Sequence, residues 1–226
     1  THEMLKALGK LGFIFYEPII LMISSIFFLS AWSNLIDVAL ILTFILLFST
    51  KHKYMLLLAN NKMIQCSLTS ILIPMIFPTF GIIFLMKIML LKSGFSYIFY
   101  GYLVVEVHDS AAMLSGKYLG RRKIWPKLSP QKTWVGTIVG IIIALTTGIA
   151  ARDFVFFSFD QAVFCSCVLI LSAISGDILT SWIKRQTNIK VFSHLVPTQG
   201  GLLDIYDSLI FASPAYFLIL SWFKIN

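Results

Sequence analysis

The sequence predicts an all-α fold of the polytopic membrane class, with about seven (six to nine) transmembrane helices. Hydrophobic residues make up 58% of the 226 residues, and charged residues only 12%. A soluble domain typically carries about 25% charged residues, because its surface must face water. Long apolar runs also recur from one end of the chain to the other. The composition therefore excludes an ordinary soluble domain and predicts one integral membrane unit.

A helix needs roughly 20 apolar residues to cross a bilayer, or somewhat fewer where the bilayer is thin. Pro74 and Pro78 divide one of the candidate runs, which is either one long kinked helix or two half-helices. The candidate run 94–107 is short for a full span. The candidate spans are 11–33, 35–50, 64–91, 94–107, 134–151, 155–174 and 206–223. The first run is too long for a cleaved signal peptide and lacks a small-residue cleavage site, so we expect none.

Basic residues concentrate in two polar stretches, 108–133 and 175–205, which hold nine of the 18 Lys and Arg residues. The apolar runs between them would form a helical hairpin, so both stretches are expected at one membrane face. The positive-inside rule places that face in the cytoplasm. We accordingly divide the chain into N-terminal transmembrane helices (1–107) and a C-terminal catalytic region (108–226) with cytoplasmic loops at 108–133 and 175–205. The net charge of +8 also suits an anionic lipid headgroup or nucleotide.

Three of the ten acidic residues, Asp109, Asp177 and Asp204, lie in these stretches, and a fourth, Asp207, follows two residues after the second stretch. The ordinary explanation for such a carboxylate is solvation at the interface beside a lysine. That explanation is weaker for Asp177, Asp204 and Asp207, because each lies beside Gly, Ser or a basic pair. Asp177 ends "SGD" and Asp204 follows Gly200-Gly201, and such small neighbours let a bulky anion and its metal approach the backbone. Paired carboxylates with phosphate oxygens are the usual ligands of Mg²⁺. The pattern therefore favours a metal and phosphate site.

The segment "SWIKRQ" adds cations and a hydroxyl to this site. Lys184 follows Asp177 by about two helical turns, with Ser181 between them, so all three share one helix face. Arg185 comes next. An acid, a hydroxyl and a cation on one face suit a phosphate better than an ion path, and a simple basic belt would not require the acid.

The segment "KLSPQKTW" carries Lys127, Ser129, Lys132 and Thr133 around Pro130, which is expected to fix a turn. Two ammonium groups and two hydroxyls suit a polyphosphate. The alternative, slightly favoured on these residues alone, is a basic loop that caps a helix starting near Trp134. The two histidines in the polar stretches, His108 and His194, lack a second histidine at ligand spacing, so they are expected to be interfacial polar residues rather than zinc ligands. The three cysteines lie in apolar runs and are interpreted as small hydrophobic residues.

Taken together, the two stretches resemble the phosphatidate cytidylyltransferase (CDP-diacylglycerol synthase) family. Its C-terminal signature corresponds without a gap to Ser181–Asp207, through "SWIKR", Lys190 and the Gly-Gly-x2-Asp-x2-Asp ending. Its first signature corresponds to Asp109–Gly120 and to Pro126–Gly136. The resemblance covers about 108–214, near half of the chain. Three positions depart from the family pattern: Val191 for Asp, Gln199 for His and Ile205 for Arg.

The resemblance implies an integral enzyme of a bacterial-type inner membrane that joins CTP and phosphatidic acid with the help of Mg²⁺, with room for a second cation. Asp177 and Asp204 would hold the metal, and Asp207 would support them or a second cation. Lys184, Arg185 and Ser181 would complete the catalytic set. The partners implied are the two substrates and the lipid bilayer, with no nucleic acid and a homodimer as one candidate assembly. The substrate-binding set would be Asp109, Lys127, Ser129, Lys132, Thr133, Lys190, Gly200 and Gly201.

Other functions stay open on the sequence alone. The departures at Gln199 and Ile205 keep a CTP-dependent polyprenol kinase or a cytidylyltransferase for another lipid phosphate as alternatives. An inactive lipid-binding paralogue is a third, although all four aspartates are present. A transporter is disfavoured because the acids lie at helix ends rather than at the membrane midplane.

Overall fold

The computed structural model describes residues 2–9, 25, 75–126, 128–196 and 200–223, and the fold below refers to these residues alone. The expected spans 11–33 (apart from residue 25) and 35–50, and 64–91 up to residue 74, lie outside them. The described chain is mostly helical, as the sequence predicts, but it does not test the expected number of about seven spans.

A short N-terminal helix, α1 (His2–Gly9), is followed after the undescribed segment by a π-helical turn (Met75–Phe80) that runs directly into α5 (Gly81–Met89). The long helix α6 (Gly94–Leu119) then leads to a hairpin of β1 (Lys123–Trp125) and β2 (Ser129–Thr133). Helix α7 (Trp134–Ala150), a 3₁₀ turn (Arg152–Val155) and α8 (Phe159–Gln186) follow. Helix α9 (Leu202–Trp222) ends the described chain.

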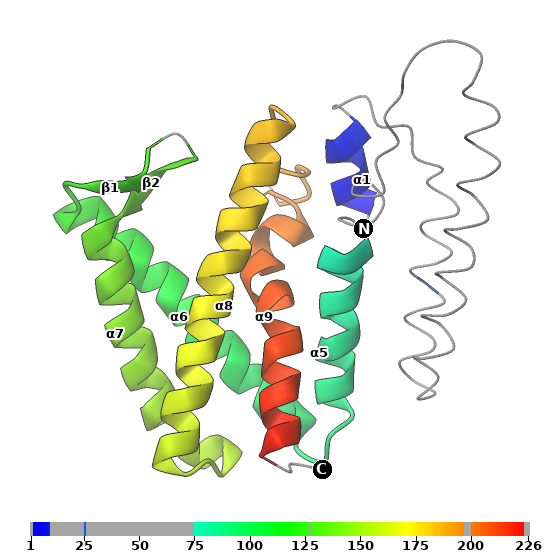
Figure 1. Cartoon of the computed structure of the whole chain (residues 1–226), viewed down its shortest axis with the longest axis vertical. Helices are drawn as coiled ribbons and strands as arrows, with labels where there is room; N and C mark the ends of the chain where they lie inside the picture. The colour runs from blue at the N-terminus through cyan, green and yellow to red at the C-terminus, as the bar shows by residue number, and fades with distance from the viewer. Residues whose placement is uncertain (1, 10–24, 26–74, 127, 197–199, 224–226) are drawn as a thin grey trace.

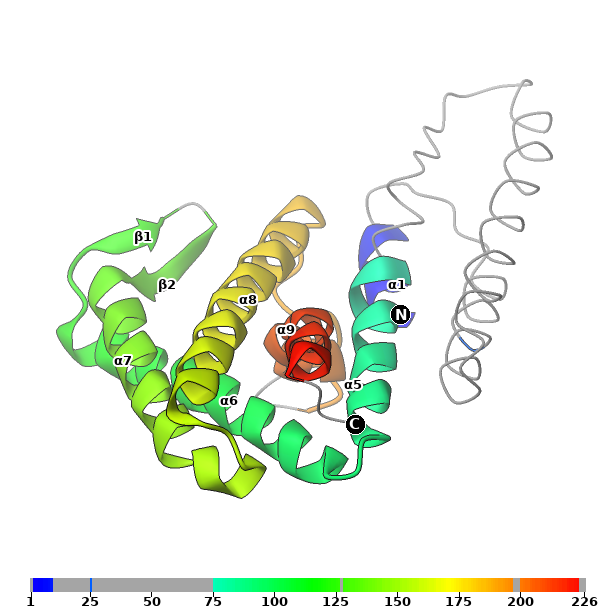
Figure 2. The ribbon, with the colours of Figure 1, turned by 60° about the horizontal axis from the view of Figure 1, so that its bottom comes forward.

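The helices form a bundle in which α9 lies between α8 and α5, while α6 crosses obliquely beneath them and packs along α7 (Figures 1 and 2). The β-hairpin, α1 and the C-terminal end of α8 lie at one end of this bundle, and the α7–α8 turn lies at the other (Figure 1). Two helices, Phe159–Gln186 and Leu202–Trp222, are long and apolar enough to cross a membrane among the described residues. Pro78–Met89 and Trp134–Ala150 are shorter apolar helices.

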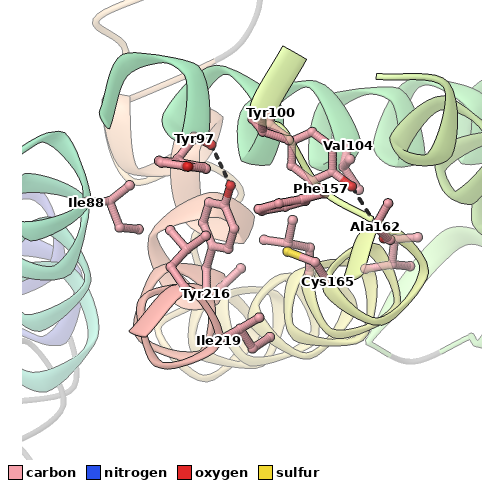
Figure 3. Packing of buried hydrophobic residues seen from close by; sticks show 14 of the residues in the cluster. Ile88, Tyr97, Tyr100, Val104, Phe157, Ala162, Cys165, Tyr216 and Ile219 are labelled. Atoms are coloured by element: carbon pink, nitrogen blue, oxygen red, sulfur yellow. Dashed lines mark hydrogen bonds between the residues drawn. The ribbon is translucent and has the colours of Figure 1, made fainter. Parts of the chain in front are cut away.

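Tyrosines pack at the centre of the bundle, with their rings buried and their hydroxyls hydrogen-bonded (Figure 3). Tyr216 of α9 donates to the carbonyl of Tyr97 at 2.7 Å, and Tyr100 Oη lies 2.8 Å from Ser166 Oγ of α8. Both Tyr100 and Tyr216 are almost completely buried. These bonds tie α6 to α8 and α9, because a buried hydroxyl without a partner would cost stability.

Helix α9 contains Pro214, which cannot donate the backbone hydrogen bond that would normally reach Ile210. Ser213 Oγ lies 2.8 Å from that freed carbonyl and 2.7 Å from the carbonyl of Gly81. A side chain at Gly81 would collide with the Ile210 backbone. Helices α5 and α9 therefore meet closely where the proline interrupts the ladder, as small residues allow in membrane bundles.

The two polar stretches come together at one end of the bundle, as the hairpin prediction requires. Arg185 Nε, near the end of α8, donates to the carbonyl of Leu128 in the β-hairpin at 3.0 Å. Neither stretch is a loop throughout, however, because α6 continues to Leu119 and α8 to Gln186. Pro130 also lies within β2 rather than at the turn, to which Pro126 and Leu128 belong. A two-stranded sheet has only edge strands, so a proline is tolerated there.

Candidate active site

Asp204 is the most constrained acid at this end of the bundle. Its side chain is 4% exposed, in the first turn of α9. One oxygen, Oδ2, accepts from the backbone N–H of Phe192 at 2.8 Å and of Gly201 at 2.9 Å. The second contact caps the start of α9, where backbone N–H groups have no partner within the helix. Asp204 thus uses one oxygen for structure and leaves the other, Oδ1, for a cation.

Lys184 supplies that cation in the structure. Its Nζ lies 2.7 Å from Asp204 Oδ1 and 5.0 Å from the centre of the Phe192 ring. The lysine side chain is 16% exposed, so the pair is largely screened from solvent. The sequence predicted that Lys184 shares a helix face with Asp177, but the structure pairs it with an acid on the neighbouring helix. A pair across α8 and α9 fixes their relative position as well as their charges.

Asp177 forms the second ion pair, with Lys132 of β2. Its other oxygen, Oδ1, accepts from Ser181 Oγ one turn along α8 at 3.3 Å. Both side chains of this pair are about one quarter exposed, at 28% for Asp177 and 25% for Lys132. The β-hairpin therefore delivers a lysine to α8, and this pair is open to solvent and to ligands.

Asp207 is buried between α8 and α9 and has no lysine of its own within hydrogen-bond distance among the described residues. Its Oδ2 accepts from Thr180 Oγ1 at 2.6 Å, and its Oδ1 accepts from the backbone N–H of Ser208 at 2.7 Å. Thr180 lies three residues after Asp177, on the same side of α8. Asp207 therefore joins the two helices through Thr180, which lies between Asp177 and Lys184 along α8, and supports the geometry of the ion pairs.

The glycines of this region act mainly in packing. Gly200 has φ +97°, in the left-handed region that favours glycine, and a Cβ there would lie 2.8 Å from Asp204 Oδ2. The backbones of Gly200 and Val196 exchange two hydrogen bonds of 2.8 and 2.9 Å, which close the loop before α9. Gly176 of "SGD" faces Phe211 of α9. Its small size lets two helices approach, whereas the sequence suggested an approach of anion and metal.

The residues of "KLSPQKTW" separate into two groups. Thr133 is 2% exposed, and its hydroxyl accepts from the Gly136 N–H at 3.1 Å, so it caps α7. This confirms the interpretation of the segment as a cap for the helix starting at Trp134. Lys132 reaches Asp177, and the partly exposed Ser129 lies on the same strand. Lys127 lies outside the described residues.

The other predicted residues lie around this centre or apart from it. Asp109 of α6 contacts His108 Nδ1 at 3.0 Å through Oδ1 and is 40% exposed. His108 itself is 4% exposed, whereas His194 is exposed, and an interfacial position of both histidines stays a prediction. Lys190 is exposed on the loop after α8. Val191 lies beside Gly200, and Gln199 is outside the described residues.

Two residues of this region, Thr180 and Glu3, were not predicted from the sequence. Thr180 could have been found, because it lies on the same helical face as Asp177 and Lys184. Glu3 gave no signal, since its contacts are to residues about 190 to 200 positions further along the chain. Its Oε1 accepts from Ser193 Oγ at 2.6 Å, and its Oε2 accepts from the Leu203 N–H at 2.9 Å.

The centre thus presents two carboxylates, each with one oxygen held by hydrogen-bond donors and the other facing an ammonium group. Such alternating charge suits cations and phosphates together. Among the described residues, no group of three or more His, Cys, Asp or Glu side chains could hold a metal. Fold and site together define a helical membrane-type protein with an electrostatic site for a charged ligand at one end of its bundle.

Comparison with known proteins gives the family. Residues 1–223 match the Cytidylyltransferase family, and the chain belongs to it. A phosphatidate cytidylyltransferase of Rickettsia typhi is 31% identical over 200 residues, which cover 82% of this chain and 88% of that protein. Proteins of the same name from Staphylococcus aureus (strain COL) and Bacillus subtilis are 36% identical over 131 residues and 35% over 135. Each of these two alignments spans half of the relative and 57% or 59% of this chain.

The family and the two long apolar helices together make this a membrane protein. The predicted resemblance is therefore confirmed at the level of the family. The individual site residues stay predictions, because neither the comparison nor the fold tests what each of them binds.

Proposed function

We propose that this protein transfers the cytidylyl group of CTP to phosphatidic acid and so forms CDP-diacylglycerol and pyrophosphate. Relatives named phosphatidate cytidylyltransferase, one of them aligned over 88% of its length, support this assignment. The main structural support is two neighbouring ion pairs, Lys132 with Asp177 and Lys184 with Asp204. They supply acids for a metal and cations for phosphates within one small region.

Mg²⁺ is the proposed cofactor, and the donor set fits it. Mg²⁺ commonly takes one or two protein carboxylates, and the substrate phosphates and water provide the other ligands. Asp177 Oδ2 and Asp204 Oδ1 each already face a positive charge, while the partner oxygen of each carboxylate is held by donors. When bound, the metal would withdraw charge from the triphosphate and stabilise the leaving pyrophosphate. Asp207, held by Thr180, would support this arrangement or a second cation.

The proposed reaction needs little proton transfer. An oxygen of the lipid phosphate forms a bond to the α-phosphorus of CTP, and the bond from that phosphorus to the bridging oxygen of pyrophosphate breaks. The attacking oxygen is already anionic, so the main barrier is the approach of two anions and the charge on the leaving group. Lys132 and Lys184 would leave their carboxylates for phosphate oxygens, and Ser181 would donate a hydrogen bond. Arg185 holds the hairpin that carries Lys132.

The same assignment implies the finer topology. The chain would cross a bacterial-type inner membrane about seven times. The hairpin, the end of α8 and the start of α9 would face the cytoplasm, where CTP is available. The basic residues of the hairpin region, including Arg121 and Arg122, support this orientation through the positive-inside rule. The lipid would enter from the side, with its tails in the bilayer.

Labelled CTP tests the proposal and separates it from the kinase alternative, which the departures at Gln199 and Ile205 keep open. Membranes containing the protein are incubated with CTP labelled at either the α- or the γ-phosphate and with phosphatidic acid, a polyprenol or a polyprenyl phosphate. We expect lipid-soluble label only from the α-phosphate and only with phosphatidic acid. Label from the γ-phosphate would instead identify a kinase, and α-label on another lipid phosphate would change the substrate.

A further inference from the structure

We propose that Glu3 of the N-terminal helix is a positioning residue that holds Asp204 in place for the metal and phosphate chemistry. The hydrogen bonds of Glu3 in the described structure go to Ser193 and Leu203, not to Asp204 or Lys184. It instead binds the two chain segments that present hydrogen-bond donors to Asp204. The inference rests on the proposed function for its catalytic consequence, but its structural part can be tested separately.

The first step is the environment of Asp204. Its Oδ2 is held from two sides, by the backbone N–H of Phe192 on the loop after α8 and by that of Gly201 at the start of α9. These two donors lie nine residues apart in sequence. The orientation of Oδ1 toward Lys184 therefore depends on keeping the loop and the helix start in register.

Glu3 links these same two segments. Its Oε1 accepts from Ser193, the residue after Phe192, and its Oε2 accepts from the backbone N–H of Leu203, the residue before Asp204. One carboxylate oxygen thus binds the neighbour of the Phe192 donor, and the other binds the neighbour of Asp204 itself. The helix start also provides a favourable potential for a negative charge.

Two further observations show that this contact is built into the packing. Met4 is completely buried in a cluster with Ile183, Phe192, Leu203 and Ile210, so the short helix is anchored next to its acid. A Cβ at Gly201 would lie 2.5 Å from Glu3 Oε1 and 2.6 Å from Ser193 Oγ. The glycine at this position therefore leaves the space that the Glu3 carboxylate occupies.

Hydrogen exchange of the purified full chain in detergent tests the structural part. In Glu3→Ala, we expect the amides of the segment 192–203 to exchange about tenfold faster, because two hydrogen bonds to the segment are lost. Glu3→Gln should give a smaller increase, since an amide keeps only one acceptor oxygen. The control is Lys6→Ala on the exposed side of the same helix, which should leave this segment unchanged. Unchanged exchange in Glu3→Ala overturns the inference.

The Mg²⁺ dependence of cytidylyl transfer tests the positioning part. In Glu3→Gln, we expect the Mg²⁺ concentration for half-maximal transfer to rise about tenfold, as when an outer partner of a metal ligand is removed. The KM for CTP at saturating Mg²⁺ should change little. If Glu3→Gln lowers only the amount of folded protein and leaves the metal requirement unaltered, Glu3 is a packing residue and the inference fails. If the wild type transfers no label at all, the proposed function fails, and the exchange measurement still decides whether Glu3 holds this segment.

Discussion

Asp177 and Asp204 occupy the same end of the bundle and each pairs with a lysine, but their settings differ. Asp204 is 4% exposed and accepts two backbone hydrogen bonds, whereas Asp177 is 28% exposed and accepts one side-chain hydrogen bond from Ser181. Asp204 is therefore part of the folded framework as well as of the proposed chemistry. Asp177 is held by fewer contacts on the solvent side, so in the proposed reaction it would exchange its lysine for a metal at little structural cost.

This difference matters for interpreting mutations. A loss of activity at Asp204 combines chemistry with folding, because the same carboxylate caps α9 and neutralises Lys184. A loss at Asp177 reports mainly on chemistry. Substitutions at the two positions and at their supporting residues therefore separate folding from chemistry.

Asp204→Asn should have the largest effect. The amide oxygen can still accept from Phe192 and Gly201, but its NH₂ group then faces the Lys184 ammonium. Leaving a largely buried lysine without its acid costs about 3 kcal/mol of unfolding free energy. Transfer of label from CTP should fall about a hundredfold or more, because a proposed metal ligand is lost. Thermal unfolding in detergent and transfer per folded molecule measure the two effects, and a stable, fully active variant would contradict both roles.

Thr180→Val should destabilise the protein through Asp207. The substitution keeps the shape of the side chain but removes the 2.6 Å donor to a buried carboxylate, at a cost of about 2 kcal/mol. Thr187→Val is the matched control, because Thr187 Oγ1 contacts only backbone carbonyls of α8 in the described structure. Equal melting temperatures for the two variants would show that the Thr180 contact with Asp207 contributes no stability.

Replacing Arg185 should have a smaller effect, because the residue is exposed and its contact is a single hydrogen bond to Leu128. Arg185→Gln loses the charge and the tether, whereas Arg185→Lys keeps the charge and loses the guanidinium geometry. If the tether is what matters, both variants should reduce transfer by about threefold to tenfold, which corresponds to roughly 1 kcal/mol. Normal activity in Arg185→Lys alone would assign the role to charge instead.

Substitutions at the positions that depart from the family pattern should have the smallest effect on transfer. Combining Gln199→His with Ile205→Arg restores the family residues near Gly200 and Asp204. If those residues report catalytic fitness, transfer to phosphatidic acid should rise about twofold to tenfold, within the range of one hydrogen bond. Unchanged or lower transfer would indicate that the chain is adapted to its own residues.

Apolar patterning predicts much of the fold but not its long-range contacts. The run 134–151 became α7, at Trp134–Ala150, and 206–223 became α9, at Leu202–Trp222. The expected span 155–174 ends 12 residues before the end of α8, which continues to Gln186. Hydropathy reports the part of a helix that suits a bilayer, and the polar turns from Asp177 to Arg185 extend beyond that part.

The candidate site was predicted as a set of residues rather than as pairs. Local spacing placed Ser181 beside Asp177, and the structure contains that hydrogen bond. The pairing of Lys132 with Asp177 and of Lys184 with Asp204 depends on how separate elements meet, which spacing along one helix cannot reveal. The contact of Glu3 with Leu203 is more distant still in sequence.

The most direct test of the account is transfer of label from α-labelled CTP to phosphatidic acid by Asp177→Asn, compared with the wild type at equal amounts of folded protein. Asp177 and Lys132 are partly exposed, so losing their pairing should change the unfolding free energy by less than about 1 kcal/mol. We predict wild-type melting and about one hundredth of wild-type transfer or less, because a proposed metal ligand is lost and removal of even an outer-shell partner costs roughly 10- to 100-fold. Wild-type transfer by this variant would contradict the assignment of the two ion pairs as the catalytic centre.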